Sequence, residues 1–191
     1  VVPGTVVLNN LTGLGGWGDY GSGGGKGGGI YNGDTLTLSN SSISGNATGD
    51  GGFSHFGPYM NVGGAGGGIY NGGTLEISQS TISGNITGDG GGDSDGLGSD
   101  GGSGGGIYNG GVLTVTGCTV STNTTGDGSE GDYGNSGSGG GIFSQATLEL
   151  YSSTIYGNTA GSTEVDGMGG GIYTSGMLTI GNTILAQNVG I

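Results

Sequence analysis

The chain has 191 residues, of which 57 are glycine and only 2 are proline, a balance that excludes a collagen triple helix. With 14 acidic residues against one basic residue, its formal net charge of −13 excludes nucleic acid and anionic lipid as favourable partners. No apolar run approaches the roughly 20 residues that a membrane span requires, and the length fits a single domain over residues 1–191.

The first segment, residues 1–26, begins with an apolar stretch that matches part of the later sequence. Val6, Leu8 and Asn10 align with Leu36, Leu38 and Asn40. We therefore expect residues 1–26 to hold a partial first coil, entered at its second strand, and then an insertion. Five repeats are expected over residues 27–191.

Each repeat starts with the motif G-I-[YF] and continues with aliphatic residues at fixed spacing. Counted from the isoleucine, aliphatic residues come 6, 8 and 13 positions later in every copy, and an asparagine comes 16 positions later. Alternation with a period of two residues indicates strands, so each repeat predicts three short strands. Two of the expected core columns are Ile30, Ile69, Ile107, Ile142 and Ile172, and Leu36, Leu75, Leu113, Leu148 and Leu178.

Repeats of this kind predict an all-β fold, a parallel β-solenoid. A single coil cannot bury its aliphatic side chains, whereas coils stacked about 4.8 Å apart pair each strand with its copies above and below. The asparagines are expected to form a ladder of side-chain amides along the axis, and a binding role is the alternative. This ladder consists of Asn46, Asn85, Asn123, Asn158 and Asn188.

The paired motifs GGGI and I-S-G-N resemble the GGAI and FxxN repeats of polymorphic outer-membrane proteins and related adhesin-like repeats. They are carried most fully by Gly27–Ile30 with Ile43–Asn46, Gly66–Ile69 with Ile82–Asn85, and Gly104–Ile107 with Val120–Asn123. The resemblance implies a right-handed parallel β-helix, here of about five to six coils, together with export and a surface role. The chain departs from the pattern in having isoleucine, valine or leucine in place of the family's phenylalanine.

Spacers of 22, 21, 18 and 13 residues, rich in glycine, serine and aspartate, separate the repeats and are expected to leave the solenoid at one corner. Because ordering costs about 1–2 kcal/mol per residue, three states are open: solvated loops, loops fixed by calcium, or extended glycine-rich segments packed against their neighbours. Carboxylates are the ligands that calcium prefers. The candidate calcium ligands are Asp89, Asp93, Asp95, Asp100, Asp127, Glu130 and Asp132.

An aromatic residue follows the first isoleucine of every repeat and is expected to face outward. The resulting stripe consists of Tyr31, Tyr70, Tyr108, Phe143 and Tyr173. Three roles are open for this stripe: it is covered by the spacers, it makes a lateral contact with another protein, or it forms a platform for glycans. The single cysteine, Cys118, excludes an internal disulfide and falls in a column of serine and threonine, where we expect a small buried filler.

Enzymatic functions of β-helices fit these residues poorly. Polysaccharide lyases need basic groups, and the chain has one lysine and no arginine. Hydrolases need two fixed carboxylates, and the outward strand carboxylates Glu76 and Glu149 lie two coils apart with Thr114 between them. The threonine array that an ice-binding face would need is interrupted. The chain is therefore expected not to be an enzyme.

The expected function is that of a structural protein, extracellular or on the cell surface. Because neither end of the solenoid carries a capping segment, the sequence predicts head-to-tail stacking into a filament or matrix fibre. A monomeric surface adhesin, or a passenger fragment of the autotransporter type, is the alternative. The expected partners are further copies of the chain and cell-surface or matrix glycans, and calcium is the one cofactor considered.

Overall fold

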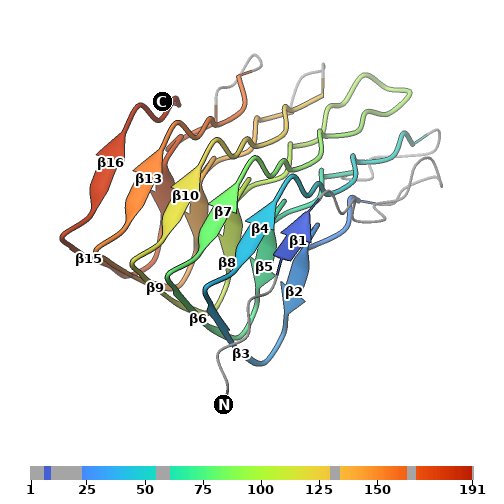
Figure 1. The fold of residues 1–191 in the computed structure, drawn as a ribbon. Helices are drawn as coiled ribbons and strands as arrows, with labels where there is room; N and C mark the ends of the chain where they lie inside the picture. Colours follow the sequence, from blue (N-terminus) through green and yellow to red (C-terminus); the bar gives the residue numbers. More distant parts are fainter. Residues whose placement is uncertain (1–6, 10–22, 55–60, 130–133, 163–166, 191) are drawn as a thin grey trace.

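The structure is a computed structural model that describes residues 7–9, 23–54, 61–129, 134–162 and 167–190. Within these ranges the chain forms strands β1 to β16 and no helix. The strands lie in three parallel sheets that enclose one core (Figure 1). The predicted all-β parallel solenoid is confirmed.

Each repeat contributes one strand to each sheet. The first strands are β2 (Ile30–Asn32), β5 (Ile69–Asn71), β8 (Ile107–Asn109), β11 (Ile142–Ser144) and β14 (Ile172–Thr174). The second strands are β3 (Thr35–Ser39), β6 (Thr74–Ser78), β9 (Val112–Thr116), β12 (Thr147–Tyr151) and β15 (Leu178–Gly181). The third strands are β4 (Ser42–Ser44), β7 (Thr81–Ser83), β10 (Thr119–Ser121), β13 (Thr154–Tyr156) and β16 (Ile184–Ala186), and β1 (Val7–Asn9) extends their sheet at one edge.

Matched positions of the repeats lie directly over one another. Ile69 of β5 pairs with Ile30 on one side and with Ile107 on the other, and the remaining columns follow the same register. The inward side chains of the middle coils are completely buried, as at Ile69, Leu113 and Ile155. Burial of aliphatic side chains contributes about 1.5–3 kcal/mol each, so the aliphatic columns form the core of the rod.

The position of β1 corrects one expectation. Leu8 pairs with Ile43 of β4, so β1 belongs to the sheet of third strands and not to the sheet of second strands. The second strands alternate two aliphatic residues with polar ones, as in TLTLS, and the third strands place one aliphatic residue between polar ones, as in SIS. Both patterns have a period of two residues, so a match of alternation alone did not distinguish the two sheets. Val6 and Asn10, which were expected to align with Leu36 and Asn40, lie outside the described residues.

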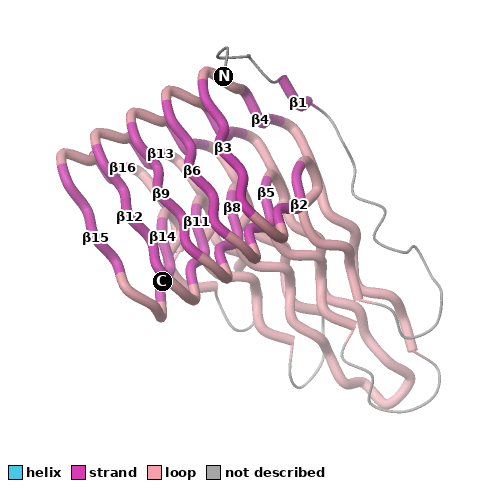
Figure 2. The backbone as a smooth tube through the Cα atoms, turned by 90° about the horizontal axis from the view of Figure 1, so that it is seen from below, coloured by secondary structure: helices cyan, strands magenta, loops and turns pink. Residues whose placement is uncertain are grey.

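The spacers project together from one edge of the solenoid as stacked arms (Figure 2). We call the part that leaves a third strand the outgoing arm and the part that leads to the next first strand the returning arm. Outgoing arms of neighbouring coils form main-chain hydrogen bonds with one another, for example from Thr48 N to Ile86 O at 3.1 Å and from Gly51 N to Asp89 O at 2.8 Å. Returning arms do the same, from Gly63 N to Asp100 O at 2.9 Å. Outgoing and returning arms also join within a coil, from Gly102 N to Gly88 O at 2.9 Å.

The described spacer residues therefore adopt the third of the expected states, extended segments packed against their neighbours. This packing requires glycine where two main chains meet. A Cβ atom on Gly102 would lie 1.8 Å from the carbonyl oxygen of Gly64, and one on Gly88 would lie 2.0 Å from that of Gly49. No side chain fits at such positions, so the abundance of glycine in the spacers follows from the close approach of their backbones.

Candidate functional site

The ladder asparagines lie in one column, in which Asn46, Asn85, Asn123 and Asn158 are completely buried. The side-chain nitrogen of Asn85 donates to Oδ1 of Asn123 at 2.9 Å and to the carbonyl of Ile43 at 3.0 Å. Its own Oδ1 accepts the main-chain N–H and the side-chain amide of Asn46. Since every hydrogen-bonding group of the amide is used inside the protein, this column has a structural role and offers nothing to a ligand.

A second asparagine ladder lies at the end of the first strands. Asn32 Nδ2 donates to Asn71 Oδ1 at 2.8 Å, and Asn71 Nδ2 donates to Asn109 Oδ1 at 2.8 Å. Asn109 continues the ladder to Ser144 Oγ at 2.9 Å. These bonds join the first four of the five repeats that the first ladder joins, and they too are buried.

Three of the candidate calcium ligands accept main-chain N–H groups within the spacers. Asp89 Oδ1 accepts the main-chain N–H of Asp127 at 2.8 Å, one coil further on. Asp93 Oδ1 accepts the N–H groups of Asp95 and Leu97 at 2.9 Å and so closes a local turn. Asp100 Oδ1 accepts both the main-chain and the side-chain N–H of Asn135.

These carboxylates act as hydrogen-bond acceptors for the spacers. In the described part of the chain, no three histidine, cysteine, aspartate or glutamate side chains gather as they would around a metal ion. Glu130 and Asp132 lie outside the described residues. Calcium binding therefore stays a prediction.

Cys118 lies in the serine column between Ser80 and Ser153, where its thiol is buried. It donates to the carbonyl of Thr116 at 3.3 Å, as Ser80 Oγ does to the carbonyl of Ser78. Burial raises the pKa of the Cys118 thiol. A protonated, buried thiol is a poor nucleophile, so this cysteine acts as a filler.

The aromatic stripe forms one continuous stack along the first sheet. Neighbouring ring centroids lie 4.8 to 5.3 Å apart, and the ring planes differ by at most 21°. Because Tyr70, Tyr108 and Phe143 each have a ring on both sides, their faces are covered and their edges remain accessible. A sugar ring therefore has no open face to stack on at these three positions.

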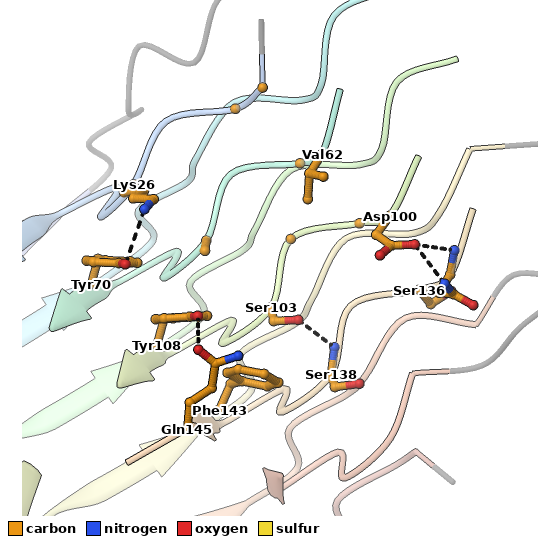
Figure 3. A pocket seen from close by; sticks show the side chains of 17 residues that line it. Lys26, Val62, Tyr70, Asp100, Ser103, Tyr108, Ser136, Ser138, Phe143 and Gln145 are labelled. Carbon is orange, nitrogen blue, oxygen red and sulfur yellow. Dashed lines mark hydrogen bonds between the residues drawn. The ribbon is translucent and has the colours of Figure 1, made fainter. Parts of the chain in front are cut away.

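A groove of about 450 Å³ lies between the aromatic stack and the returning arms (Figure 3). Tyr70, Tyr108 and Phe143 form one wall, and Gly63 and Gly102 belong to the other. Its remaining side chains come from four coils and are mostly neutral and polar. They include Lys26, Val62, Ala65, Asp100, Ser103, Asn135, Ser136, Ser138 and Gln145.

Two tyrosine hydroxyls are held by side chains at the ends of this groove. Lys26 Nζ donates to the hydroxyl of Tyr70 at 3.2 Å, and this bond is the main cause that raises the pKa of Lys26. The Tyr108 hydroxyl donates to Gln145 Oε1 at 2.7 Å, and burial raises the pKa of Tyr108. At neutral pH, Lys26 is therefore cationic and Tyr108 keeps its proton.

The chain matches no protein-family model, no curated protein and no solved structure. In the described part of the chain, no helix is long and apolar enough to cross a membrane.

Proposed function

We propose that this chain is a non-enzymatic, extracellular structural protein whose solenoids stack end to end into a filament or matrix fibre. The supporting observation is the uncovered core of the last coil. Leu178, Ile180 and Leu185 are 38%, 44% and 48% exposed, whereas Leu148, Leu150 and Ile155, which pair with them from the preceding coil, are 0% exposed. Another coil placed on this end would bury all three side chains.

The main chain at this end is also open. Within the described residues, β14, β15 and β16 each pair with one neighbouring strand and leave the other edge free. At the opposite end, β2 and β3 have no second partner strand among the described residues, and β1 extends the third sheet one strand further. Open parallel edges are templates for further pairing. Since the two ends differ, their contact repeats in one direction and forms a filament rather than a closed dimer.

A non-enzymatic role is supported by the position of the strand carboxylates. Glu76 and Glu149 lie in one column on either side of Thr114, and neither lines the groove. Stacking about 4.8 Å per coil places them about 9.6 Å apart, at the upper limit of about 9.5 Å for inverting hydrolases. The groove therefore brings neither carboxylate to a glycosidic bond.

An extracellular location is supported by the resemblance of GGGI and I-S-G-N to adhesin-like β-helix repeats. The aliphatic residue in place of phenylalanine, such as Ile82, is the main departure. A monomeric surface adhesin is the second candidate, favoured by the groove beside the aromatic stack.

Sedimentation and negative-stain electron microscopy of the 191-residue chain test end-to-end stacking. We expect long particles of uniform width, and their loss in the variant Ile180→Lys, which places a charge on the uncovered core. Thr179→Lys is the matched control, because Thr179 lies on the same strand and pairs with Glu149, between the inward positions of Leu178 and Ile180. Discrete particles of the unchanged chain at every concentration, or equal effects of the two variants, would contradict the proposal.

A further inference from the structure

We propose that the groove between the aromatic stack and the returning arms binds a neutral polysaccharide chain that lies parallel to the solenoid axis. The groove runs along the side of the rod, so this inference does not depend on stacking at its ends.

The shape of the groove fits a polymer. Ala65, Ser103 and Ser138 occupy the same position in successive coils, directly before a glycine with positive φ. Lys26 holds this position one coil earlier, and its main chain forms a parallel β-bridge with Ala65. The lining therefore repeats once per coil, at about 4.8 Å. A ligand with a repeating unit, extended along the axis, can make similar contacts in each coil, which a compact molecule cannot.

The chemistry of the lining fits a neutral carbohydrate. Tyr70, Tyr108, Ser103, Ser138 and Gln145 line the groove (Figure 3). The oxygens of Ser103 and Ser138 each accept a main-chain N–H of the next coil, and their hydroxyl protons can still be donated to a ligand. Such groups donate to and accept from sugar hydroxyls. With one cation in the groove and a net charge of −13 on the chain, an anionic polymer is repelled.

The aromatic wall adds to this preference. The stacked rings turn their edges, and not their faces, to the groove. An aromatic edge carries partial positive charge, so it attracts the oxygen atoms of a sugar more than its C–H groups. Contacts of this wall are therefore expected with hydroxyl and ring oxygens.

An extended peptide is a weaker fit. Peptides that add to a sheet need a free main-chain edge. Along the groove, the main-chain N–H groups of Gly63, Gly101 and Gly102 already bond to Asp100, Asn135 and Gly88. The walls thus present side-chain groups, which suit a carbohydrate.

Affinity electrophoresis in gels that contain hydroxyethyl cellulose or galactomannan tests the proposal, with polygalacturonate and a neutral Gly-Ser peptide as competing ligands. The double variant Tyr70→Phe/Tyr108→Phe removes two hydroxyls from the groove and keeps the stack. The matched control, Tyr31→Phe/Tyr173→Phe, makes the same change in the same stack, outside the groove lining. We expect the groove variant to weaken binding about tenfold and the control by less than about twofold.

All variants are prepared in the Ile180→Lys background, so that a failure of end-to-end stacking does not affect the measurement. Thermal unfolding confirms that each variant is folded. The proposal is overturned if neither neutral polysaccharide binds, if the two double variants lose affinity equally, or if polygalacturonate or the peptide binds as tightly.

Discussion

The hydroxyl of Thr87 donates a hydrogen bond of 2.6 Å to the carbonyl oxygen of Gly102, which joins the outgoing arm of one spacer to its returning arm. The same hydroxyl oxygen accepts the main-chain N–H of Gly126, one coil further on, at 2.8 Å. Thr48 and Thr125 make the same pair of bonds in the neighbouring coils. One buried side chain per coil therefore links two arms and two layers.

Replacing Thr87 by valine should destabilise the protein. The two side chains have similar shapes, but valine leaves the carbonyl of Gly102 and the N–H of Gly126 without their partner. We expect a loss of about 1–3 kcal/mol in the free energy of unfolding, measured by urea titration. Thr81→Val, at an exposed position of β7, is the control and should change stability by less than about 0.5 kcal/mol. Equal losses would show that the hydroxyl of Thr87 is unimportant.

Replacing Gly102 by alanine should disrupt the packing of the arms. The added Cβ would meet the carbonyl oxygen of Gly64 at 1.8 Å, so the backbones must separate. We expect a loss of about 1–3 kcal/mol or more, with faster hydrogen exchange of the spacer amides. In Gly110→Ala the nearest atom lies 3.7 Å away, so this control should keep the protection of the arms. Unchanged exchange in Gly102→Ala would refute the close packing.

Replacing an asparagine in the middle of the ladder should lower the stability of the protein more than replacing one at its end. Asn123→Ala removes the acceptor of two Asn85 groups and a donor to Asn158, all of them buried. We expect a loss of about 2–5 kcal/mol. Asn188 lies half-buried in the last coil, and its Oδ1 accepts the same two groups from Asn158. Among the described residues its side-chain nitrogen donates to the carbonyl of Ile155 and to no further asparagine, so Asn188→Ala should cost less. The reverse order in thermal unfolding would contradict the ladder.

The calcium hypothesis can be separated from the acceptor role at Asp89. Asp89→Asn keeps an oxygen for the N–H of Asp127, and should change stability by less than about 0.5 kcal/mol. Asp89→Leu removes this oxygen, and should cost about 0.5–1.5 kcal/mol. If Asp89 acts as a hydrogen-bond acceptor alone, a chelator shifts neither result. The carboxylate is a metal ligand if two results are found. In calcium, Asp89→Asn loses as much stability as Asp89→Leu, and in chelator the stability of Asp89→Asn equals that of the unchanged chain.

The strands and the core could be predicted because aliphatic residues recur in fixed register. The ordered, packed conformation of the spacers could not be predicted in this way. Its stability comes from main-chain hydrogen bonds between glycines, which leave no side-chain pattern. One signal was present in the sequence, the triplet T-G-D at Thr48–Asp50, Thr87–Asp89 and Thr125–Asp127, which starts two residues after each of the first three ladder asparagines. Its threonine proved to be the residue that joins the arms.

The groove could not be predicted from the sequence. Lys26 and Gln145 line the same groove, although more than three repeats of sequence separate them. Their proximity depends on the path of the returning arms, which the spacers' composition does not determine. The sequence predicted the aromatic stripe, but not that its rings would stack closely enough to cover one another's faces.

X-ray diffraction from oriented filaments tests the central claim, that coils share main-chain bonds within a solenoid and across the contact between two chains. We predict a reflection at about 4.7–4.9 Å along the filament axis, because the coils stack in that direction. A reflection at this spacing perpendicular to the axis, or the absence of filaments at all concentrations, would contradict the account.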